Sequence, residues 1–256
     1  MNVKKMALGA YQTNCYLLWE GDRAAVIDPG YEPDTILRAL QTLELRLEAI
    51  LLTHGHFDHV GAVKELVAET GCHVYIHASE ATLPPMMTAG ELYYTHTYSE
   101  GDTVRPFPGL ELTVLHTPGH TPGSVCLLMR DQMFSGDTLF QGSCGRVDFP
   151  GSSPRDMMTS LNRLASLQAD YQVHPGHGPS TTLSREKQYN PYMRCPKAIR
   201  HCEPVRRLAR NDSSILRKIY ETITHRPRGT LCGGAAAAGP VPPGTHGADH
   251  RSHRPI

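Results

Sequence analysis

The segment HGHFDH, residues 54–59, contains three histidines and one aspartate. Imidazole nitrogens and carboxylate oxygens, without a thiolate, are ligands for Zn²⁺ and also for Fe or Mn ions. The rings of His54 and His56 can face one ion if the backbone turns tightly at the intervening glycine. Asp58 and His59 can then face a neighbouring ion from the first turn of a following helix. The segment therefore predicts a site for metal ions.

Three later loops each present one further ligand type, bracketed by glycine or proline. They are TPGHTPGS at 117–124, FSGDTL at 134–139 and HPGHG at 174–178, which display His120, Asp137 and His177. Each loop follows a short apolar segment that reads as a strand. Ligand sites in α/β proteins lie in loops at the carboxyl ends of strands, so these loops can converge on the first segment. Core packing does not generate such a pattern.

Other polar side chains carry weaker signals. Asp28 ends a predicted strand beside a Pro-Gly pair, where its carboxylate could accept a hydrogen bond from a ligand histidine. The alternative for Asp28 is ordinary turn chemistry. The remaining histidines in the strand-rich part of the chain are interpreted as structural: His73, His77, His96, His116 and His174.

The elements that must position these loops alternate between strands and helices up to about residue 190. Apolar spacing predicts helices at 33–43, 58–70 and 154–167. Strands are predicted at 14–20, 23–28, 48–53, 73–77, 110–116, 124–129, 132–135 and 171–174. This alternation is typical of an α/β fold, and the two similar halves indicate two sheets packed face to face with helices outside.

The chain changes character after its first 192 residues. Residues 1–192 are predicted to form one catalytic domain. Residues 193–256 form a tail rich in Gly, Ala and Pro, predicted to be disordered apart from one helix at 213–224. Residues 1–190 contain 13 Lys and Arg against 21 Asp and Glu, whereas residues 191–256 contain 12 against 4. We interpret this basic tail as an extension that activity does not require.

Bulk composition excludes several partner classes. The chain has 25 Lys and Arg and 25 Asp and Glu among 256 residues, so net charge gives no support for a nucleic-acid partner. No apolar run reaches the roughly 18 residues of a membrane span, and no apolar signal segment is recognisable. Seven cysteines without a C-x-x-C pair favour a reducing compartment over a disulfide framework. We expect a cytoplasmic protein with neither a nucleic-acid nor a membrane partner.

The order His-x-His-x-Asp-His, Gly-His, Gly-Asp and Gly-His resembles the metallo-β-lactamase superfamily. The resemblance covers about residues 1–190, and all seven ligand positions are filled. It implies an αββα sandwich with the site at one edge of the sheets. It also implies two divalent ions, for which we expect Zn²⁺, with Fe or Mn as alternatives. The implied ligands are His54, His56 and His120 for the first ion, Asp58, His59 and His177 for the second, and Asp137 as the bridge.

The implied chemistry is hydrolysis. Two cations lower the pKa of a shared water, so that hydroxide forms near neutral pH and attacks an electrophilic carbonyl. No Ser or Cys nucleophile is needed, and Asp58 is expected to orient the hydroxide.

The segment GSCGRVDFPG, residues 142–151, resembles the G-R-T-D-F-P-G stretch of bacterial glyoxalase II-like proteins. Val147 stands where those proteins usually have Thr. In that family the basic residue helps to bind a glutathione thioester, so Arg146 is the candidate substrate-binding residue. Its structural alternative is an ion pair with Asp148. The tail lacks the helical series of long glyoxalase II enzymes, so the chain resembles the short hydroxyacylglutathione hydrolase-like enzymes, and its expected substrate is S-lactoylglutathione or a similar thioester.

Other activities of this scaffold stay open. A glutathione persulfide dioxygenase with a single iron has a similar stretch but uses fewer ligands than are present here. A lactonase or a β-lactamase is a second alternative. A nuclease is favoured only by the basic tail. A metal-binding protein without catalysis would be expected to lack ligands, and none is missing.

Overall fold

Two six-stranded sheets form the centre of the fold in the computed structural model, which describes residues 1–88 and 90–194. The first sheet follows the order β1-β2-β3-β4-β5-β6. Its strands are β1 (Asn2–Leu8), β2 (Thr13–Glu20), β3 (Arg23–Ile27), β4 (Arg46–Leu51), β5 (His73–His77) and β6 (His96–Tyr98).

The second sheet follows the order β14-β13-β10-β9-β8-β7. Its strands are β7 (Thr103–Phe107), β8 (Leu110–His116), β9 (Val125–Met129), β10 (Gln132–Gly136), β13 (Gln172–Pro175) and β14 (Thr181–Thr182). A separate small hairpin, β11 (Leu139–Phe140) and β12 (Ser143–Cys144), follows β10.

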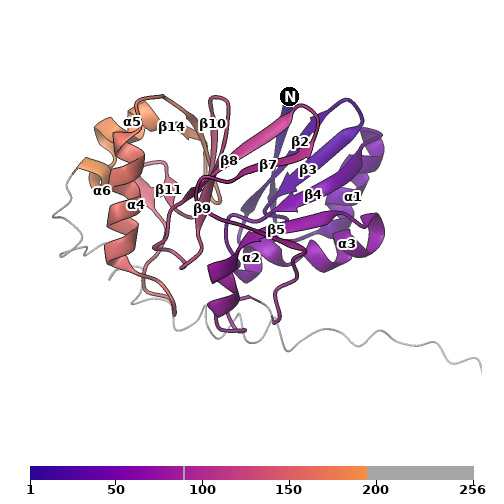
Figure 1. The fold of residues 1–256 in the computed structure, drawn as a ribbon, viewed down its shortest axis with the longest axis horizontal. Helices are drawn as coiled ribbons and strands as arrows, with labels where there is room; N and C mark the ends of the chain where they lie inside the picture. The colour runs from indigo at the N-terminus through magenta and orange to yellow at the C-terminus, as the bar shows by residue number, and fades with distance from the viewer. Residues whose placement is uncertain (89, 195–256) are drawn as a thin grey trace, which may run out of the picture. The chain divides into compact units, whose positions relative to one another are not determined.

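Helices cover the outer face of each sheet (Figure 1). The first sheet is covered by α1 (Pro33–Thr42) and α3 (Val63–Thr70), and the second by α4 (Pro154–Ser166), α5 (Leu183–Tyr189) and α6 (Pro191–Arg194). Two short elements, α2 (Phe57–Val60) and the 3₁₀ turn η1 (Ala78–Thr82), follow β4 and β5. The predicted αββα sandwich is therefore confirmed.

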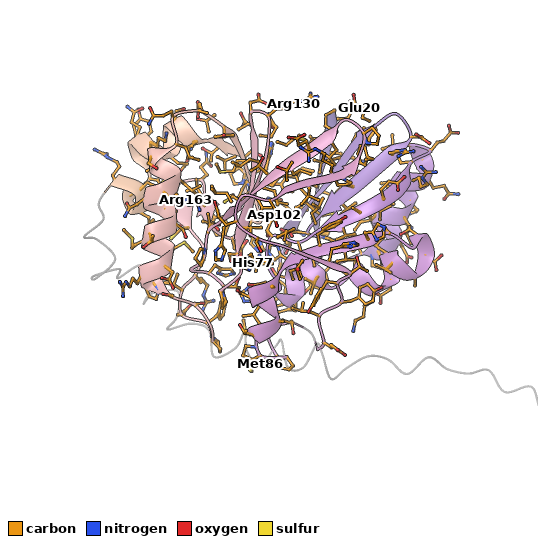
Figure 2. The ribbon with its side chains drawn as sticks, in the orientation of Figure 1. Glu20, His77, Met86, Asp102, Arg130 and Arg163 are labelled. Atoms are coloured by element: carbon orange, nitrogen blue, oxygen red, sulfur yellow. The ribbon has the colours of Figure 1, made fainter. Side chains whose placement is uncertain are left out.

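Apolar side chains from both sheets meet in one shared cluster between them. Tyr16 and Leu51 of the first sheet belong to this cluster with Leu127 and Phe134 of the second. The rings of Tyr16 and Phe134 pack edge to face, with centroids 5.2 Å apart. Side chains fill the space between the two sheets in Figure 2. Burial of each such large side chain stabilises the fold by about 1.5–3 kcal/mol. The cluster therefore holds the two sheets together, and with them the loops that carry the site.

The predicted continuous helix over 58–70 is wrong, because the chain breaks it into α2 and α3. The N–H group of Ala62 donates to the carbonyl of Pro29 at 3.0 Å instead of to a carbonyl within its own helix. A new helix then starts at Val63 and ends at Thr70, and the following Gly71 has a φ of 69°, the left-handed conformation expected of a terminating glycine. The break is a tertiary effect that periodicity cannot show.

Helix α6 extends the described fold to Arg194. The side chain of Met193 is buried in the cluster that packs α4 against the second sheet. The predicted domain boundary at residue 192 thus falls inside α6. The rest of the predicted tail, with its helix at 213–224, lies outside the described residues. Within residues 1–88 and 90–194, none of the helices has both the length and the apolar character that crossing a bilayer requires.

Candidate metal centre

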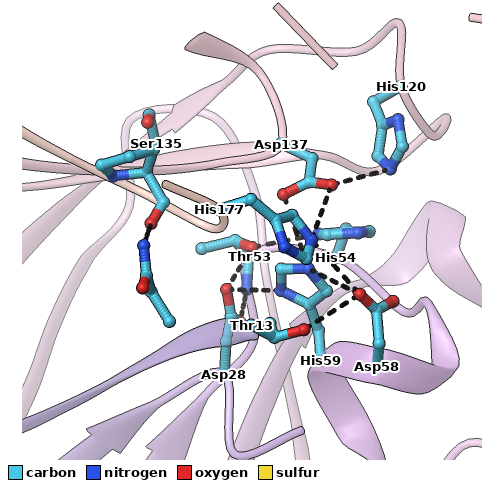
Figure 3. Close-up of polar contacts among 12 residues, drawn as sticks. Thr13, Asp28, Thr53, His54, Asp58, His59, His120, Ser135, Asp137 and His177 are labelled. Atoms are coloured by element: carbon cyan, nitrogen blue, oxygen red, sulfur yellow. Dashed lines mark hydrogen bonds and ion pairs between the residues drawn. The ribbon is translucent and has the colours of Figure 1, made fainter. Parts of the chain in front are cut away.

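Seven residues from four segments of the chain come together beyond the carboxyl ends of the strands, and Figure 3 labels all of them except His56. The loop after β4 supplies two histidines and leads into α2, which supplies Asp58 and His59. The loops after β8, β10 and β13 supply His120, Asp137 and His177. All these loops follow the carboxyl ends of strands, as the sequence predicted from the apolar segments that precede them.

The ligand atoms fall into two groups. The first consists of His54, His56 and His120, and the second of Asp58, His59 and His177; within each, the candidate ligand atoms lie within 4.8 Å of one another. The two groups match the two ligand sets that the family resemblance implies.

Asp137 faces both groups. Its Oδ1 atom lies 3.4 Å from Nε2 of His59, and its Oδ2 atom lies 3.5 Å from Nε2 of His120 and 3.6 Å from Nε2 of His177. The neighbouring Gly176 permits this approach, because a Cβ there would lie only 2.2 Å from Oδ1 of Asp137. Asp137 thus lies between the two groups, and its role as a bridging ligand stays a prediction.

Several of these atoms are buried without a hydrogen-bond partner. In the described part of the chain they are Nε2 of His54, His56, His59 and His120, and Oδ1 of Asp137. An unsatisfied buried polar atom costs about 1–3 kcal/mol, so five such atoms in one place require a ligand. The set of imidazole and carboxylate donors suits Zn²⁺, Fe or Mn. The residues therefore fit divalent metal ions.

The opposite ring nitrogens of these histidines have protein partners. Nδ1 of His59 lies 3.0 Å from Oδ2 of Asp28, and Nδ1 of His54 lies 3.1 Å from Oγ1 of Thr53. Nδ1 of His120 lies 2.8 Å from the carbonyl oxygen of Arg146. Such partners fix the tautomer and the orientation of a metal-binding imidazole, here with Nε2 turned toward the centre.

Asp28 could itself complete a third ligand group with His54 and His59. Its carboxylate is already bonded to Thr53, whose backbone N–H donates to Oδ1 at 2.8 Å and whose hydroxyl donates to Oδ2 at 2.6 Å. Because Asp28 faces Nδ1 of His59, it lies on the far side of the ring from the unpartnered Nε2. We therefore treat Asp28 as a support for His59 and not as a ligand.

Replacing Asp28 by asparagine is expected to weaken zinc binding by about 10- to 100-fold. An amide offers one acceptor oxygen where Asp28 accepts from three donors, and loss of such a support typically lowers metal affinity by this amount. A competition titration with a chromogenic chelator measures the change. Asp131→Asn, at a fully exposed carboxylate beside Gln132, is the control. Unchanged affinity in Asp28→Asn would contradict the supporting role.

Burial and charge shift the pKa values of the cluster in opposite directions. Burial lowers the pKa of His54, His56 and His120 below the ordinary value. Burial acts in the same sense on His59, but Asp58 and the other nearby carboxylates outweigh it and raise its pKa to about 10. Without metal, His59 therefore carries a positive charge where the carboxylates converge.

Asp58 has a pKa well below its usual range. Burial acts to raise it, but His59 and His177 stabilise the ionised carboxylate more strongly. Oδ2 of Asp58 lies 3.2 Å from Nε2 of His177 and accepts a hydrogen bond from Oγ1 of Thr13 at 3.1 Å. The side chain of His177 is 29% exposed, whereas those of Asp58 and Asp137 are 12% and 10% exposed. The centre therefore opens to solvent beside His177.

The backbone of Arg146 contacts His120 of the cluster, whereas its guanidinium is bonded to Asp148. Its guanidinium makes a two-pronged ion pair with Asp148, with both N–O distances at 2.9 Å. It also lies 4.3 Å above the ring of Phe149, which packs against the rings of His56 and His120. The structural alternative, the ion pair, is thus present. A role for Arg146 in substrate binding stays a prediction.

The histidines interpreted as structural lie outside the candidate ligand groups of the described residues. His77 and His116 stack with centroids 4.2 Å apart, and His73 and His96 contact edge to face. His174 is held by the side chain of Gln132, with Nε2 and Oε1 2.6 Å apart.

Sequence reasoning missed three residues that shape the centre. Thr13 bonds Asp58 and pairs with His177 in an isolated bridge, and Thr53 joins Asp28 to His54. Glu80 is fully buried beside the ligand loops. Neither threonine has a motif that marks it, and Glu80 is separated by 25 or more residues from the loops that it contacts. Its one sequence signal is an acidic side chain three positions after the end of a strand.

Known proteins resemble this chain over about three quarters of its length. Hydroxyacylglutathione hydrolase GloC of Haemophilus influenzae is 34% identical over 209 residues, which cover 75% of this chain and 98% of that protein. Two solved structures are also similar: the BLEG-1 B3 metallo-beta-lactamase, with a TM-score of 0.70 and 32% identity, and TTHA1623 in a di-iron-bound form, with a TM-score of 0.65 and 42% identity. They cover 76% and 74% of this chain and each is matched over 100% of its own length.

The family model for the metallo-beta-lactamase superfamily matches residues 8–177, which include all seven residues of the cluster. The match spans more than half of the chain, and it agrees with the αββα sandwich and with a His and Asp cluster at the edge of the sheets. The chain belongs to the metallo-beta-lactamase superfamily and is a metallo-hydrolase with the αββα fold of that family.

Proposed function

We propose that the protein is a glyoxalase II-like hydrolase that cleaves a thioester, S-lactoylglutathione or a close analogue, with two divalent metal ions. The observation that carries this proposal is the pair of ligand groups joined by Asp137, with unpartnered Nε2 atoms directed into both. The similarity to hydroxyacylglutathione hydrolase GloC, over nearly the full length of that protein, supports the choice of a thioester.

In this proposal the first ion is bound by His54, His56 and His120, the second by Asp58, His59 and His177, and Asp137 bridges them. Zn²⁺ is the expected metal because imidazole-rich sites suit it. Iron is the principal alternative, supported by the di-iron form of TTHA1623, which is 42% identical to this chain. The bound cations would supply Lewis-acid chemistry, acidifying a water molecule and stabilising negative charge on a carbonyl oxygen.

The chain's own residues orient the reaction. Asp58 would accept a hydrogen bond from the attacking water, because its carboxylate is held ionised and is fixed by Thr13. The opening beside His177 would admit the thioester carbonyl. Arg146 would contact the thiol part of the substrate, which requires its guanidinium to exchange at least one of its bonds to Asp148.

We further propose that the protein acts in the cytoplasm on a small molecule. Three buried cysteines, Cys15, Cys72 and Cys126, are free thiols, which suits a reducing compartment. Burial raises the pKa of each thiol, so they are unreactive at neutral pH.

Purified protein loaded with Zn²⁺ is expected to hydrolyse S-lactoylglutathione with two metal equivalents bound. Elemental analysis and the fall in thioester absorbance measure both quantities. The same preparation is assayed with a chromogenic cephalosporin, since the similar BLEG-1 structure is that of a B3 metallo-beta-lactamase. It is also assayed for oxygen uptake with glutathione persulfide after loading with iron. Turnover of the cephalosporin or of glutathione persulfide, without turnover of the thioester, would overturn the proposed substrate.

A further inference from the structure

Glu80 connects two ligand loops that come from different sheets. It lies in η1, after β5, and its side chain is fully buried. Oε2 accepts a hydrogen bond from the backbone N–H of Gly55 at 2.5 Å, and Oε1 accepts one from the backbone N–H of Gly123 at 2.6 Å. The hydroxyl of Thr121 also bonds this carboxylate. One side chain therefore holds the backbone of two loops, at Gly55 and at Gly123.

These two loops carry the whole first ligand group. Gly55 stands between His54 and His56 in the loop after β4 of the first sheet. Thr121 and Gly123 follow His120 in the loop after β8 of the second sheet. The rings of His56 and His120 lie with centroids 4.5 Å apart although their loops follow strands of different sheets. The bonds of Glu80 span this junction.

The chemistry of a carboxylate suits this position. An ionised carboxylate only accepts hydrogen bonds, so both of its oxygens can hold N–H groups at once. Bonds to an ionised partner are about twice as strong as neutral ones. Burial raises the pKa of Glu80, and its bonds to Thr121, Gly55 and Gly123 partly offset this by stabilising the ionised form. A glutamine of the same shape would turn an NH₂ group toward one of the two N–H groups and break that connection.

We propose that Glu80 is a positioning residue for the first metal ion, which sets the distance between His120 and the pair His54 and His56 without binding the metal. The second group, Asp58, His59 and His177, lies outside its bonds. The inference rests on the metal centre of the proposed function and not on its thioester substrate.

Glu186 provides a matched control. It is also a buried glutamate, 1% exposed, and its carboxylate accepts from the N–H of Gly142 at 2.6 Å and from the hydroxyl of Thr181 at 2.7 Å. These partners belong to none of the ligand loops. Glu186→Gln therefore reports the general cost of neutralising a buried glutamate in this protein.

The test is a titration of metal-free, full-length protein with Co²⁺, followed by visible absorption and calorimetry. In Glu80→Gln we expect one of the two equivalents to bind about 10- to 100-fold more weakly, the usual effect of removing an outer support, and the other to change less than about threefold. Glu186→Gln should lower the melting temperature while leaving both equivalents unchanged.

Double variants identify the affected ion. If Glu80 acts through the first group, Glu80→Gln should lower the Co²⁺ affinity little further in a His56→Ala background, where that group is already broken. In a His177→Ala background it should lower the affinity by its full amount. The proposal is overturned if folded Glu80→Gln binds both equivalents normally, if it weakens both equally, or if Glu186→Gln has the same effect.

A second variant covers the case in which Glu80→Gln does not fold. A Cβ at Gly123 would lie 2.7 Å from Oε1 of Glu80, so Gly123→Ala pushes the carboxylate away from its partner and should weaken the same equivalent. Normal binding of both equivalents in Gly123→Ala would then refute the role of Glu80. Failure of the wild-type protein to hydrolyse thioesters would refute the substrate alone, because the Co²⁺ titration does not depend on it.

Discussion

Asp137→Ala is expected to abolish hydrolysis and to remove at least one of the two bound metal ions. Asp137 is the carboxylate that lies within 3.6 Å of Nε2 of His59, His120 and His177, and so belongs to both ligand groups. Its removal costs both ions a ligand and leaves positive charge uncompensated. A loss of about 4 kcal/mol of transition-state stabilisation, which is typical of a catalytic metal, corresponds to a decrease in kcat of about 1,000-fold.

Elemental analysis and steady-state kinetics on the same preparation measure these two effects of Asp137→Ala. Asp131→Ala serves as the control. This exposed carboxylate directly precedes β10, the strand that leads to Asp137, and its variant should retain both metals and full turnover. A melting temperature for each variant separates loss of ligand from loss of fold. Near-normal turnover in Asp137→Ala would contradict the bridging position and with it the proposed centre.

The residues of the candidate site could be predicted because their signals are local. Each ligand type stands in a short loop that follows an apolar strand, and the glycines and prolines around it are readable without tertiary information. The alternation of strands and helices likewise predicted the layered fold. Both kinds of signal depend on neighbours within about ten residues, so they appear directly in the sequence.

The features that were missed depend on contacts between distant segments. The break between α2 and α3 requires Pro29 to meet Ala62, and the role of Glu80 requires β5 to end beside two ligand loops. The first four residues of strand β1 are exposed, and β7 contains Pro106, so neither shows the alternation of a half-buried strand. Each of these features follows from packing that periodicity does not encode.

Removal of the metals is expected to destabilise the protein by about 4 kcal/mol for each site when free metal exceeds the dissociation constant 1,000-fold. The reason is the set of buried nitrogens and the Oδ1 atom of Asp137, which the metals would coordinate and which have no hydrogen-bond partner in the metal-free protein. For a chain of this size the melting temperature should fall by roughly 10 °C for each site. Calorimetry with and without a chelator measures the shift, and the same chelator should have a smaller effect on Asp137→Ala. An unchanged melting temperature would contradict metal binding at this cluster.

The free energy of unfolding of the metal-free protein should also depend on pH, through the proton on His59 that the metal-loaded protein lacks. Burial acts to lower the pKa of His59, but the surrounding carboxylates raise it to about 10, above the value of about 6.5 that an unfolded histidine has. This proton therefore stabilises the metal-free fold fully below pH 6.5, and the stabilisation is lost as pH rises through 10. Bound metal must displace the proton, so metal binding at pH 7–9 should release protons and should weaken as pH falls. Calorimetric titrations in buffers of different ionisation enthalpy measure the release. Binding without proton release in this range would show that His59 is not a ligand.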